Sequence, residues 1–398
     1  MENKSKIKIL ACSLEYPLPN GVTISLNTSI TELKRKGVRT AIISPDYNLG
    51  KLRRDHYPLQ PSFLVKNIGM IAGRKANTFG IGLSLLAYPK IKEIVKKFNP
   101  DIYWLNTIAW TINPFEIAML ETEKPKVITY HTLLEDYGKI YAGEAGAIAM
   151  KFKSKLICNK ADAIIVPNKI IKDKLHSYGV LKPIYVIPTG ISFAKKSFSR
   201  DEIRSRFKIP QKTKIILYVG RVSKEKNIEF LFDAFREIQD EIDSKLLIIG
   251  MGDIEQYSEK AKDKGIFKNT IFAGEVAKKD IEMIYGACDV FVFSSQTETQ
   301  GLVIGEAMAS GLPVVTLNSH ISKDVCPNGT AVVANNKKEF VRGVLDVLNN
   351  DNSVMTNEAK NFVYKNFSKE KMAEEQFKIF NNLFLQYLNK NDNIKKYD

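Results

Sequence analysis

The sequence predicts an α/β protein with two doubly wound parallel-sheet domains that face each other across a cleft. Its length of 398 residues is typical of two domains. Both halves alternate short apolar runs, typical of buried strands, with longer helical patterns. The stretch 188–200 contains Pro188, Gly190 and several Ser and Lys residues, which indicates a linker. Because ligands of such sheets bind at the carboxyl ends of the strands, we expect functional residues just after strands in both halves.

The N-terminal domain is predicted over residues 1–190. Its first strand precedes a Pro/Gly loop and a helix that ends near Gly37, since glycine commonly follows the last helical residue. The strands expected in this domain are 6–13, 39–45, 101–106, 126–132, 162–168 and 183–190.

The C-terminal domain is predicted over residues 191–368, with the helical pattern 227–239 among those that separate its strands. The strands expected here are 214–220, 245–250, 269–276, 290–295 and 312–318. Residues 369–398 form a last helix and a polar tail, which we expect to pack back toward the N-terminal domain.

The composition, with 44% apolar and 26% charged residues, is ordinary for a soluble globular protein. Cys12, Cys158, Cys288 and Cys326 include no close pair and the four histidines lie far apart, which argues against disulfides and metal sites. The apolar run near the N-terminus has only about five residues, and no run approaches the roughly 18 to 20 that cross a bilayer. We therefore expect a cytoplasmic protein without a metal or an integral membrane anchor.

The net charge of +15 comes from the first half of the chain. Residues 1–200 contain 31 Lys and Arg against 15 Asp and Glu, a net of +16, whereas residues 201–398 contain 28 against 29, a net of −1. A basic half is typical of proteins that bind an anionic membrane or nucleic acid, although it also occurs where charge only adds solubility. The two halves are therefore expected to face different partners.

Two cations follow the first strand of the predicted C-terminal domain. Arg221 comes after the strand end and Lys226 lies five residues later, in the turn toward a helix. Such a pair suits a diphosphate, because each charge-assisted hydrogen bond contributes about 1.5–3 kcal/mol. Loop cations that only face solvent are the alternative.

Residues 294–315, SSQTETQGLVIGEAMASGLPVV, run from a strand through a polar loop into a small-residue helix. Backbone amides near Gly301 and Leu302 point out of the helix N-terminus, where phosphate binds. Glu306 lies in the early turns, either as an acid that interacts with the helix dipole or as an acceptor for two ribose hydroxyls. Glu298, in the loop, is suited to hexose hydroxyls. The two acids and the amides between them fit a sugar nucleotide.

This segment resembles the Glu-x7-Glu motif of the retaining GT-B glycosyltransferases of family 4. Three further stretches match in the family's order: PTGIS at 188–192, GRVSKEKN at 220–227 and FAGEV at 272–276. With the Pro/Gly loop after the first strand, the resemblance covers nearly the whole chain. It implies two Rossmann-like domains, an N-terminal one that binds the acceptor and a C-terminal one that binds the nucleotide sugar.

The resemblance also implies roles for residues at the matching positions. Arg221 and Lys226 clasp the donor diphosphate, while Glu306 holds the ribose and Glu298 the transferred sugar. Gly21 brings the backbone close to the phosphates, as only a residue without Cβ can. The donor-binding residues are then Gly21, Arg221, Lys226, Glu298, Gln300, Gly301, Leu302 and Glu306.

The catalytic residues that the resemblance implies are His131, Glu298, Arg221 and Lys226. His131 follows a strand, and we expect it to place the sugar and stabilise charge at the anomeric carbon rather than act as a base; a structural histidine is the alternative. The family's reaction retains the anomeric configuration without metal or cofactor, and cations with helix amides stabilise the leaving group. The leaving diphosphate takes the acceptor proton on the same face, with a covalent glycosyl-enzyme as the competing mechanism.

Ser192 and Asn106 depart from the family's pattern, in which Asp commonly follows the linker Gly-Ile and a His is frequent in the stretch after residues 100–102. Gln300 and the stretch 130–137 look most like the members that glucosylate diacylglycerol. We therefore expect a peripheral membrane enzyme that moves glucose from UDP-glucose to the free hydroxyl of diacylglycerol. Its basic N-terminal half suits an anionic surface, the inner face of the cell membrane.

Two lysine-rich stretches are candidates for membrane contact. One contains Lys151, Phe152, Lys153, Lys155 and Lys160, and the second is 74–97; packing helices with solvated lysines are the alternative for both. Transfer of another hexose, such as mannose from GDP-mannose, to a phospholipid or polysaccharide intermediate is the alternative reaction. A basic membrane-binding scaffold is the alternative that is not an enzyme. Nucleic acid is not an expected partner, since no recognition motif is present.

Overall fold

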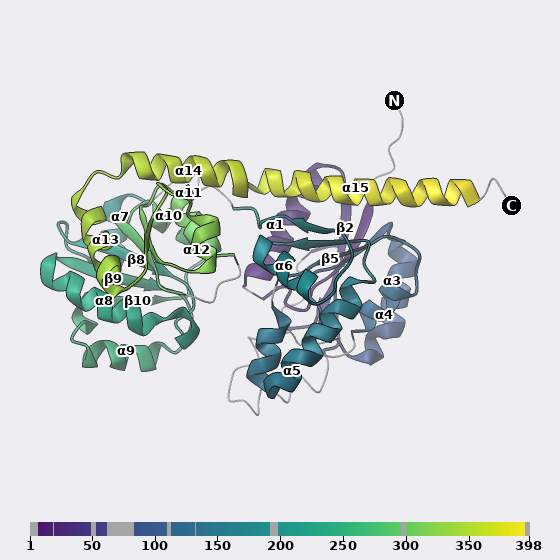
Figure 1. Ribbon diagram of the computed structural model, residues 1–398, viewed down its shortest axis with the longest axis horizontal. Helices are drawn as coiled ribbons and strands as arrows, with labels where there is room; N and C mark the ends of the chain where they lie inside the picture. Colours follow the sequence, from purple (N-terminus) through teal and green to yellow (C-terminus); the bar gives the residue numbers. More distant parts are fainter. Residues whose placement is uncertain are drawn as a thin grey trace. The chain divides into compact units, whose positions relative to one another are not determined.

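The computed structural model describes residues 7–18, 20–48, 53–61, 83–109, 113–131, 133–191, 198–295 and 300–394. The chain divides into two compact units: unit 1 contains Met1–Gly190 and Lys369–Asp398, and unit 2 contains Ile191–Ser368 (Figure 1). Each unit has one parallel sheet with helices on both faces. The predicted fold class of two parallel-sheet α/β domains is confirmed.

The sheet of unit 1 has the strand order β3-β2-β1-β4-β5-β6-β7. Its strands are β1 (Lys8–Cys12), β2 (Arg39–Pro45), β3 (His56–Leu59), β4 (Ile102–Leu105), β5 (Lys126–Thr129), β6 (Ala163–Val166) and β7 (Ile184–Val186). The sequence does not predict β3, because its four residues include a histidine and a proline that interrupt the apolar pattern. The strand order reverses between β1 and β4, which is where doubly wound sheets bind ligands.

Helices cover both faces of this sheet (Figure 1). One face packs against α1 (Gly21–Arg35) and α15 (Lys369–Ile394). The other face packs against α3 (Tyr88–Phe98), α4 (Pro114–Leu120), α5 (Leu134–Cys158) and α6 (Lys169–Ser177), and η1 (Leu85–Ala87) leads into α3. Successive strand residues alternate between the faces, so Trp104 lies in the first core and Leu105 in the second.

The helix α15 packs in unit 1 although it follows unit 2 in the sequence. The rings of Phe380 and Trp104 are 5.2 Å apart between centroids. Ser29 Oγ of α1 lies 3.7 Å from the Sδ of Met372. A Cβ at Gly190 would lie 2.4 Å from the Cα of Lys369, so only glycine permits this approach of the chain to the start of α15.

The sheet of unit 2 has the order β10-β9-β8-β11-β12-β13. Its strands are β8 (Lys214–Val219), β9 (Ser244–Ile249), β10 (Thr270–Gly274), β11 (Val290–Phe293), β12 (Val314–Leu317) and β13 (Val332–Ala334). Its helices are α7 (Arg200–Phe207), η2 (Lys224–Lys226), α8 (Ile228–Glu241), α9 (Ile254–Asp263), η3 (Phe267–Asn269), α10 (Lys278–Tyr285), α11 (Leu302–Ala309), α12 (His320–Val325), α13 (Lys337–Asn349) and α14 (Ser353–Phe367). The three-residue strand β13 was not predicted from the sequence.

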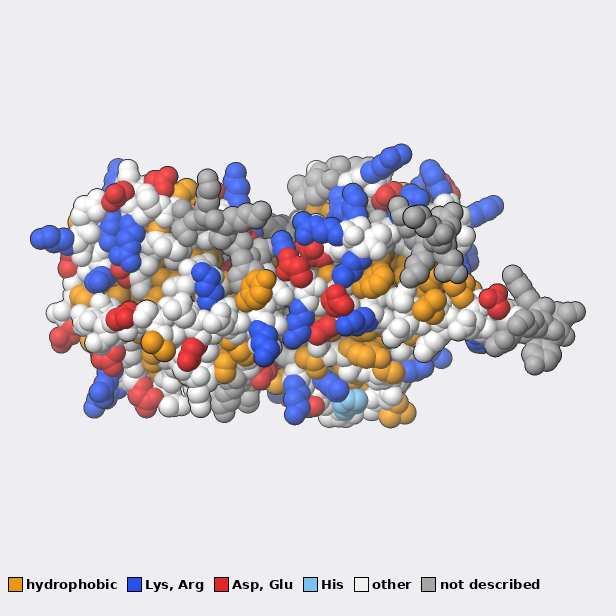
Figure 2. All heavy atoms as spheres, turned by 90° about the horizontal axis from the view of Figure 1, so that it is seen from above, with side chains coloured by type: hydrophobic (Ala, Val, Ile, Leu, Met, Phe, Trp, Pro, Cys, Tyr) orange, Lys and Arg blue, Asp and Glu red, His pale blue; other side chains and the backbone are white. Residues whose placement is uncertain are grey.

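On the face of the molecule seen in Figure 2, acidic side chains are interspersed among basic ones. In unit 1, Lys36 of α1 and Glu374 of α15 form an ion pair, with Nζ and Oε2 at 3.2 Å. The charge on this face is therefore mixed in sign. Among the described residues, no helix combines the length and the apolarity that a bilayer span requires.

Candidate functional site

The carboxyl edge of the sheet in unit 2 brings most of the predicted donor-binding residues together. β8 and β11 are parallel neighbours, with Ile216 opposite Val290 and Leu217 opposite Phe291. The strand order of this sheet reverses between them. The loop after β8 carries Arg221 and Lys226, and the loop after β11 leads to α11. Both loops therefore start from the same switch point of the sheet.

Close packing of two loops positions the backbone of Arg221. Gly250, after β9, has φ of +147°, and a Cβ there would lie 1.9 Å from the carbonyl oxygen of Gly220. Tyr218 Oη donates to the carbonyl of Arg221 at 3.0 Å. The guanidinium itself is half exposed and lies 3.4 Å from Glu225, a contact of the kind that contributes at most about 1 kcal/mol. The side chain can therefore exchange this partner for an anionic ligand at small cost.

Lys226 ends η2 and is buried, 9% exposed. Its carbonyl accepts a hydrogen bond from Ser294 Oγ at 3.0 Å, and Asn227 Nδ2 donates to the carbonyl of Ser294 at 3.3 Å. Ser295 Oγ donates to the carbonyl of Glu225 at 3.4 Å. These bonds join the loop after β8, which carries both cations of the predicted diphosphate clasp, to the end of β11.

The loop after β11 lies partly outside the described residues, and Glu298 is among those outside. Gln300 and Gly301 are described, and Gly301 adopts a left-handed conformation, φ 64°, at the N-cap of α11. The helical hydrogen bonds begin at the amide of Ile304, which donates to the carbonyl of Gly301 at 3.0 Å. Among the described residues, no side chain caps this helix. The amide of Leu302 thus has the orientation that binds phosphate at a helix N-terminus.

Glu306 lies in the second turn of α11 and is only 7% exposed. One carboxylate oxygen pairs with Lys278 Nζ, and the other accepts a hydrogen bond from Tyr285 Oη at 3.2 Å. Burial and the adjacent Glu306 carboxylate raise the pKa of Tyr285 well above its usual value, so the phenol stays a donor. No acidic residue stands in the first turn of α11, which does not support the helix-dipole alternative for Glu306.

Lys278 and Tyr285 were not predicted from the sequence. They occupy the first and last positions of α10, and α10 packs beside α11. The helical pattern around them indicates an ordinary amphipathic helix, and nothing local connects them to a residue more than twenty positions later. Their link to Glu306 depends on the packing of the two helices.

In unit 1, Gly21 begins α1, and its neighbour Asn20 caps the helix by accepting from the amide of Thr23 at 2.9 Å. His131 follows β5 by two residues, and its Nε2 is buried without a hydrogen-bond partner among the described residues. Burial lowers the pKa of His131 to about 4. The imidazole is therefore neutral near pH 7 and is a weak base, so hydrogen bonding is the role that its chemistry favours.

Other polar groups gather at the same edge of unit 1. Ser13 and Asn106 follow β1 and β4 directly, one position beyond the paired residues Cys12 and Leu105. Ser13 Oγ and Asn106 Nδ2 are buried without partners among the described residues. Burial also raises the pKa of Glu15 to about 7. Because unpartnered buried polar atoms are rare, this edge has the character of a binding site for water or ligand.

The structure divides the residues predicted to contact a membrane. Lys151, Phe152, Lys155 and Lys160 are exposed on or next to α5. Lys153 instead points inward, with Nζ 3.5 Å from Glu116 Oε2 and its side chain 17% exposed. The assignment of Lys153 is corrected accordingly: it pairs with α4 and is not available to a lipid surface. Most of the second stretch, 74–97, lies outside the described residues or forms α3.

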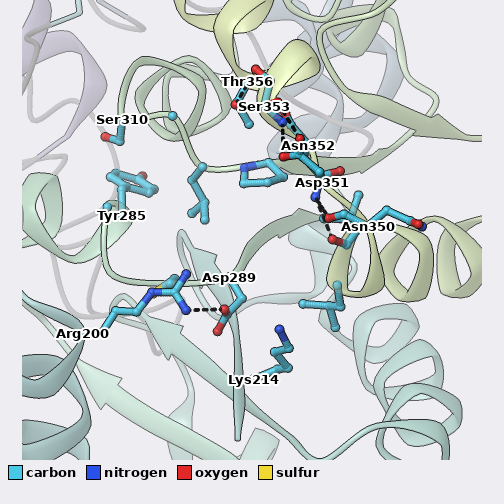
Figure 3. Close-up of a pocket in the computed structure, with 17 residues that line it drawn as sticks. Arg200, Lys214, Tyr285, Asp289, Ser310, Asn350, Asp351, Asn352, Ser353 and Thr356 are labelled. Carbon is cyan, nitrogen blue, oxygen red and sulfur yellow. Dashed lines mark hydrogen bonds and ion pairs between the residues drawn. The ribbon is translucent and has the colours of Figure 1, made fainter. Parts of the chain in front are cut away.

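A cavity of about 390 Å³ in unit 2 is lined by residues that do not include the predicted donor-binding ones (Figure 3). Lys214, at the start of β8, and Asp289, just before β11, line it, so it lies at the amino ends of these strands. Arg200 reaches Asp289 at 3.0 Å across it. The donor residues follow the opposite ends of the same strands.

Two family models match the chain: Glycosyltransferase Family 4 over residues 19–195 and Glycosyl transferases group 1 over residues 199–369. An alpha-monoglucosyldiacylglycerol synthase of Streptococcus pneumoniae is 30% identical over 321 residues, which cover 75% of this chain and 68% of that protein. An alpha-monoglucosyldiacylglycerol synthase of Acholeplasma laidlawii is 26% identical over 397 residues, 94% of this chain and 96% of that protein. A GDP-mannose-dependent alpha-mannosyltransferase of Mycolicibacterium smegmatis is 24% identical over 321 residues, 80% and 81% of the two chains.

Solved structures share the fold. A sucrose-phosphate synthase from Thermosynechococcus elongatus has a TM-score of 0.78 at 18% identity, covering 96% of this chain and 100% of that one. Anabaena HepE in complex with UDP and glucose has a TM-score of 0.74 at 17% identity, covering 94% and 100%. The fold and the matched models together define a glycosyltransferase with the GT-B fold. The chain belongs to glycosyltransferase family 4, which confirms the resemblance seen in the sequence.

Proposed function

We propose that this glycosyltransferase moves glucose from UDP-glucose to the free hydroxyl of diacylglycerol with retention of anomeric configuration, as a 1,2-diacylglycerol 3-glucosyltransferase. The observation that carries the proposal is the similarity to the Acholeplasma laidlawii alpha-monoglucosyldiacylglycerol synthase, which extends over 94% of this chain and 96% of that protein. The match therefore includes both units, the one expected to bind the acceptor and the one expected to bind the donor.

Unit 2 supplies the groups for the donor. Arg221 and Lys226 would hold the diphosphate, and the amide of Leu302 would hold one phosphate oxygen. As the bond between the anomeric carbon and the diphosphate oxygen breaks, negative charge develops on that oxygen. Preorganised cations and amides stabilise this charge because they need no reorganisation during the reaction.

The nucleoside would be held through its ribose. Glu306 would accept hydrogen bonds from the two ribose hydroxyls, and Lys278 with Tyr285 fixes the orientation of its carboxylate. A carboxylate accepts stronger hydrogen bonds than a neutral group. Glu298, outside the described residues, keeps its proposed role at the hexose hydroxyls.

The acceptor hydroxyl would attack the anomeric carbon on the face from which the diphosphate leaves. Its proton would pass to the leaving diphosphate oxygen, so no side chain need act as a base. In unit 1, His131 has the protonation state for this scheme: a neutral imidazole hydrogen-bonds a sugar hydroxyl, and its low pKa makes it a poor proton acceptor.

The purified protein should be incubated with UDP-glucose and mixed anionic micelles that contain diacylglycerol, and the product's anomer read by NMR. We expect an α-glucosyl lipid, and Arg221→Ala and Glu298→Ala variants that fold but do not transfer sugar. An inverted product, or glycosylation of another acceptor without any glycolipid, would contradict the proposal. Thermal shifts with UDP- and GDP-sugars separate it from mannosyl transfer, the activity in the name of the Mycolicibacterium smegmatis relative.

A further inference from the structure

The second half of α5 carries apolar side chains on two opposite faces. Met150 and Ile157 are buried in the core of unit 1. Ile148 and Phe152 are each 66% exposed, and Leu156 is 49% exposed. Because these three residues are spaced four apart, they form one row of about 12 Å along the outer side of the helix. A helix that is apolar on both faces has a second surface to cover.

A fourth apolar side chain is held at the C-terminal end of this row. Leu181 is 89% exposed, yet its loop is fixed to α5. Asn159, the C-cap of α5, donates from Nδ2 to the carbonyl of Gly179 at 3.0 Å and accepts from the amide of Leu181 at 2.8 Å. Single exposed apolar residues are ordinary, but a group of them on one helix and on the loop fixed to its end indicates a binding surface. The name apolar ridge is used below for Ile148, Phe152, Leu156 and Leu181.

Lysines flank the apolar ridge. Lys151, Lys155 and Lys160 are exposed, and none forms an ion pair with another described residue. Lys151 Nζ lies 5.9 Å from the ring centroid of Tyr178. The carboxylate of Glu144, at the start of this half of the helix, is paired with Lys139 at 2.5 Å. Among the described residues, the lysines that border the ridge therefore form no ion pair, although the charge of Lys151 also acts on Glu144.

We propose that the apolar ridge inserts into an anionic lipid bilayer, with Lys151, Lys155 and Lys160 at the level of the headgroups. The inference rests on the proposed function, because an enzyme with a lipid acceptor must bind the bilayer that contains it. Apolar side chains gain by leaving water for the acyl boundary, and lysines extend their stems along that boundary while their amines stay with the anionic headgroups. The apolar ridge matches the acyl region of such a surface, and the lysines beside it match the headgroup region. The net charge of +16 in residues 1–200 adds to the attraction.

The test measures binding of the full-length protein to sedimented vesicles of phosphatidylcholine alone or with phosphatidylglycerol. We expect binding that requires the anionic lipid. Phe152→Ser should lower the partition coefficient about tenfold, because a large apolar side chain no longer leaves water. The double variant Lys151→Gln with Lys155→Gln should lower it at least as much on anionic vesicles and little on neutral ones, and salt should reduce the difference.

Matched controls lie in unit 2. Val354→Ser removes an apolar side chain that is 73% exposed on α14, and Lys338→Gln removes an exposed lysine; both should bind vesicles as the unchanged protein does. Binding that is unaffected by the Phe152 and lysine changes, or equally affected by the controls, would overturn the inference. A dimer in solution that Phe152→Ser dissociates would also overturn it, because the ridge would then bind a second copy.

A separate measurement keeps this inference distinct from the proposed function. The thermal shift produced by UDP-glucose should be the same for Phe152→Ser and the unchanged protein, since α5 lies in unit 1 and the donor residues tested lie in unit 2. Vesicle binding without a UDP-glucose shift would count against the proposed donor only. A shift without vesicle binding would count against the membrane surface only.

Discussion

Replacing Glu306 with Gln tests the proposed ribose contact most directly. The change keeps the shape of the side chain and removes its negative charge. In the structure the carboxylate has two partners, Lys278 and Tyr285, and is 7% exposed, so its position is well defined. The variant should fold, because Lys278 is 40% exposed and can be solvated when its partner is neutral.

The expected loss of donor affinity follows from the type of hydrogen bond. A bond to a charged acceptor contributes about 1.5–3 kcal/mol and one to a neutral acceptor about 0.5–1.5 kcal/mol. The Glu306→Gln change therefore weakens binding through the two ribose hydroxyls by about 2 kcal/mol, which raises Kd about thirtyfold. The ribose is remote from the reacting carbon, and its contacts are equal in the ground and transition states. KM should therefore rise while kcat changes little.

The assay is calorimetric titration with UDP and with 2′-deoxy-UDP. The unchanged protein should prefer UDP, and Glu306→Gln should lose most of that preference, because the missing hydroxyl no longer meets a charged acceptor. Glu229→Gln is the matched control: this exposed glutamate of α8 pairs with Lys260 at 2.5 Å and should leave both affinities unchanged. An undiminished preference for UDP in Glu306→Gln would refute the reasoning.

Gly250→Ala should lower the free energy of unfolding by more than 2 kcal/mol, since its Cβ would overlap the backbone of Gly220. The control Gly265→Ala, also at positive φ but in open space, should lower it by only about 1 kcal/mol. Equal losses for the two variants in urea denaturation would contradict the packing of the loops at Gly250 and Gly220. Glu15→Gln should stabilise the protein, and this gain should be about 1–3 kcal/mol larger at pH 8 than at pH 5. The pKa of the Glu15 carboxyl is raised to about 7 in the folded state, so the folded protein keeps the proton that the unfolded chain loses. The unchanged protein therefore loses stability as the pH rises from the pKa of the unfolded state through about 7, whereas Gln does not titrate. The unchanged protein should lose stability as the pH falls from 6.5 to 4, because the depressed pKa keeps the folded His131 imidazole neutral while the unfolded one gains a proton. His131→Gln should remove part of this loss. Identical profiles of unfolding free energy against pH for the variant and the unchanged protein would argue against a buried imidazole.

Local sequence patterns were sufficient for most strands of both sheets. β2 lies at the predicted 39–45, and β8 differs from the predicted 214–220 only at its last residue. These strands are buried on both faces, so they read as apolar runs bounded by glycine or charge. β3 and β13, at the edges of their sheets, were not predicted. A histidine and a proline interrupt the apolar pattern of β3, and β13 was not predicted although β7, which also has three residues, was.

Contacts between distant segments account for what the sequence did not predict. Lys153 lies three residues after Met150 and four before Ile157, so the helix period places it on the buried side of α5, and the position of α4 brings Glu116 opposite it. Ser13 and Asn106 become neighbours because β1 and β4 pair in one register. Neither relation is visible in the residues next to them.

By itself the sequence determined the α/β class, the order of most strands, and a family motif whose residues follow one another in the chain, since hydrophobic period and motif spacing are properties of adjacent residues. Only the tertiary structure decided that Lys278 and Tyr285 hold Glu306 and that α5 keeps an apolar row in solvent. The physical reason is that strand register and helix packing, which bring remote side chains together, depend on the whole sheet rather than on any one stretch of it.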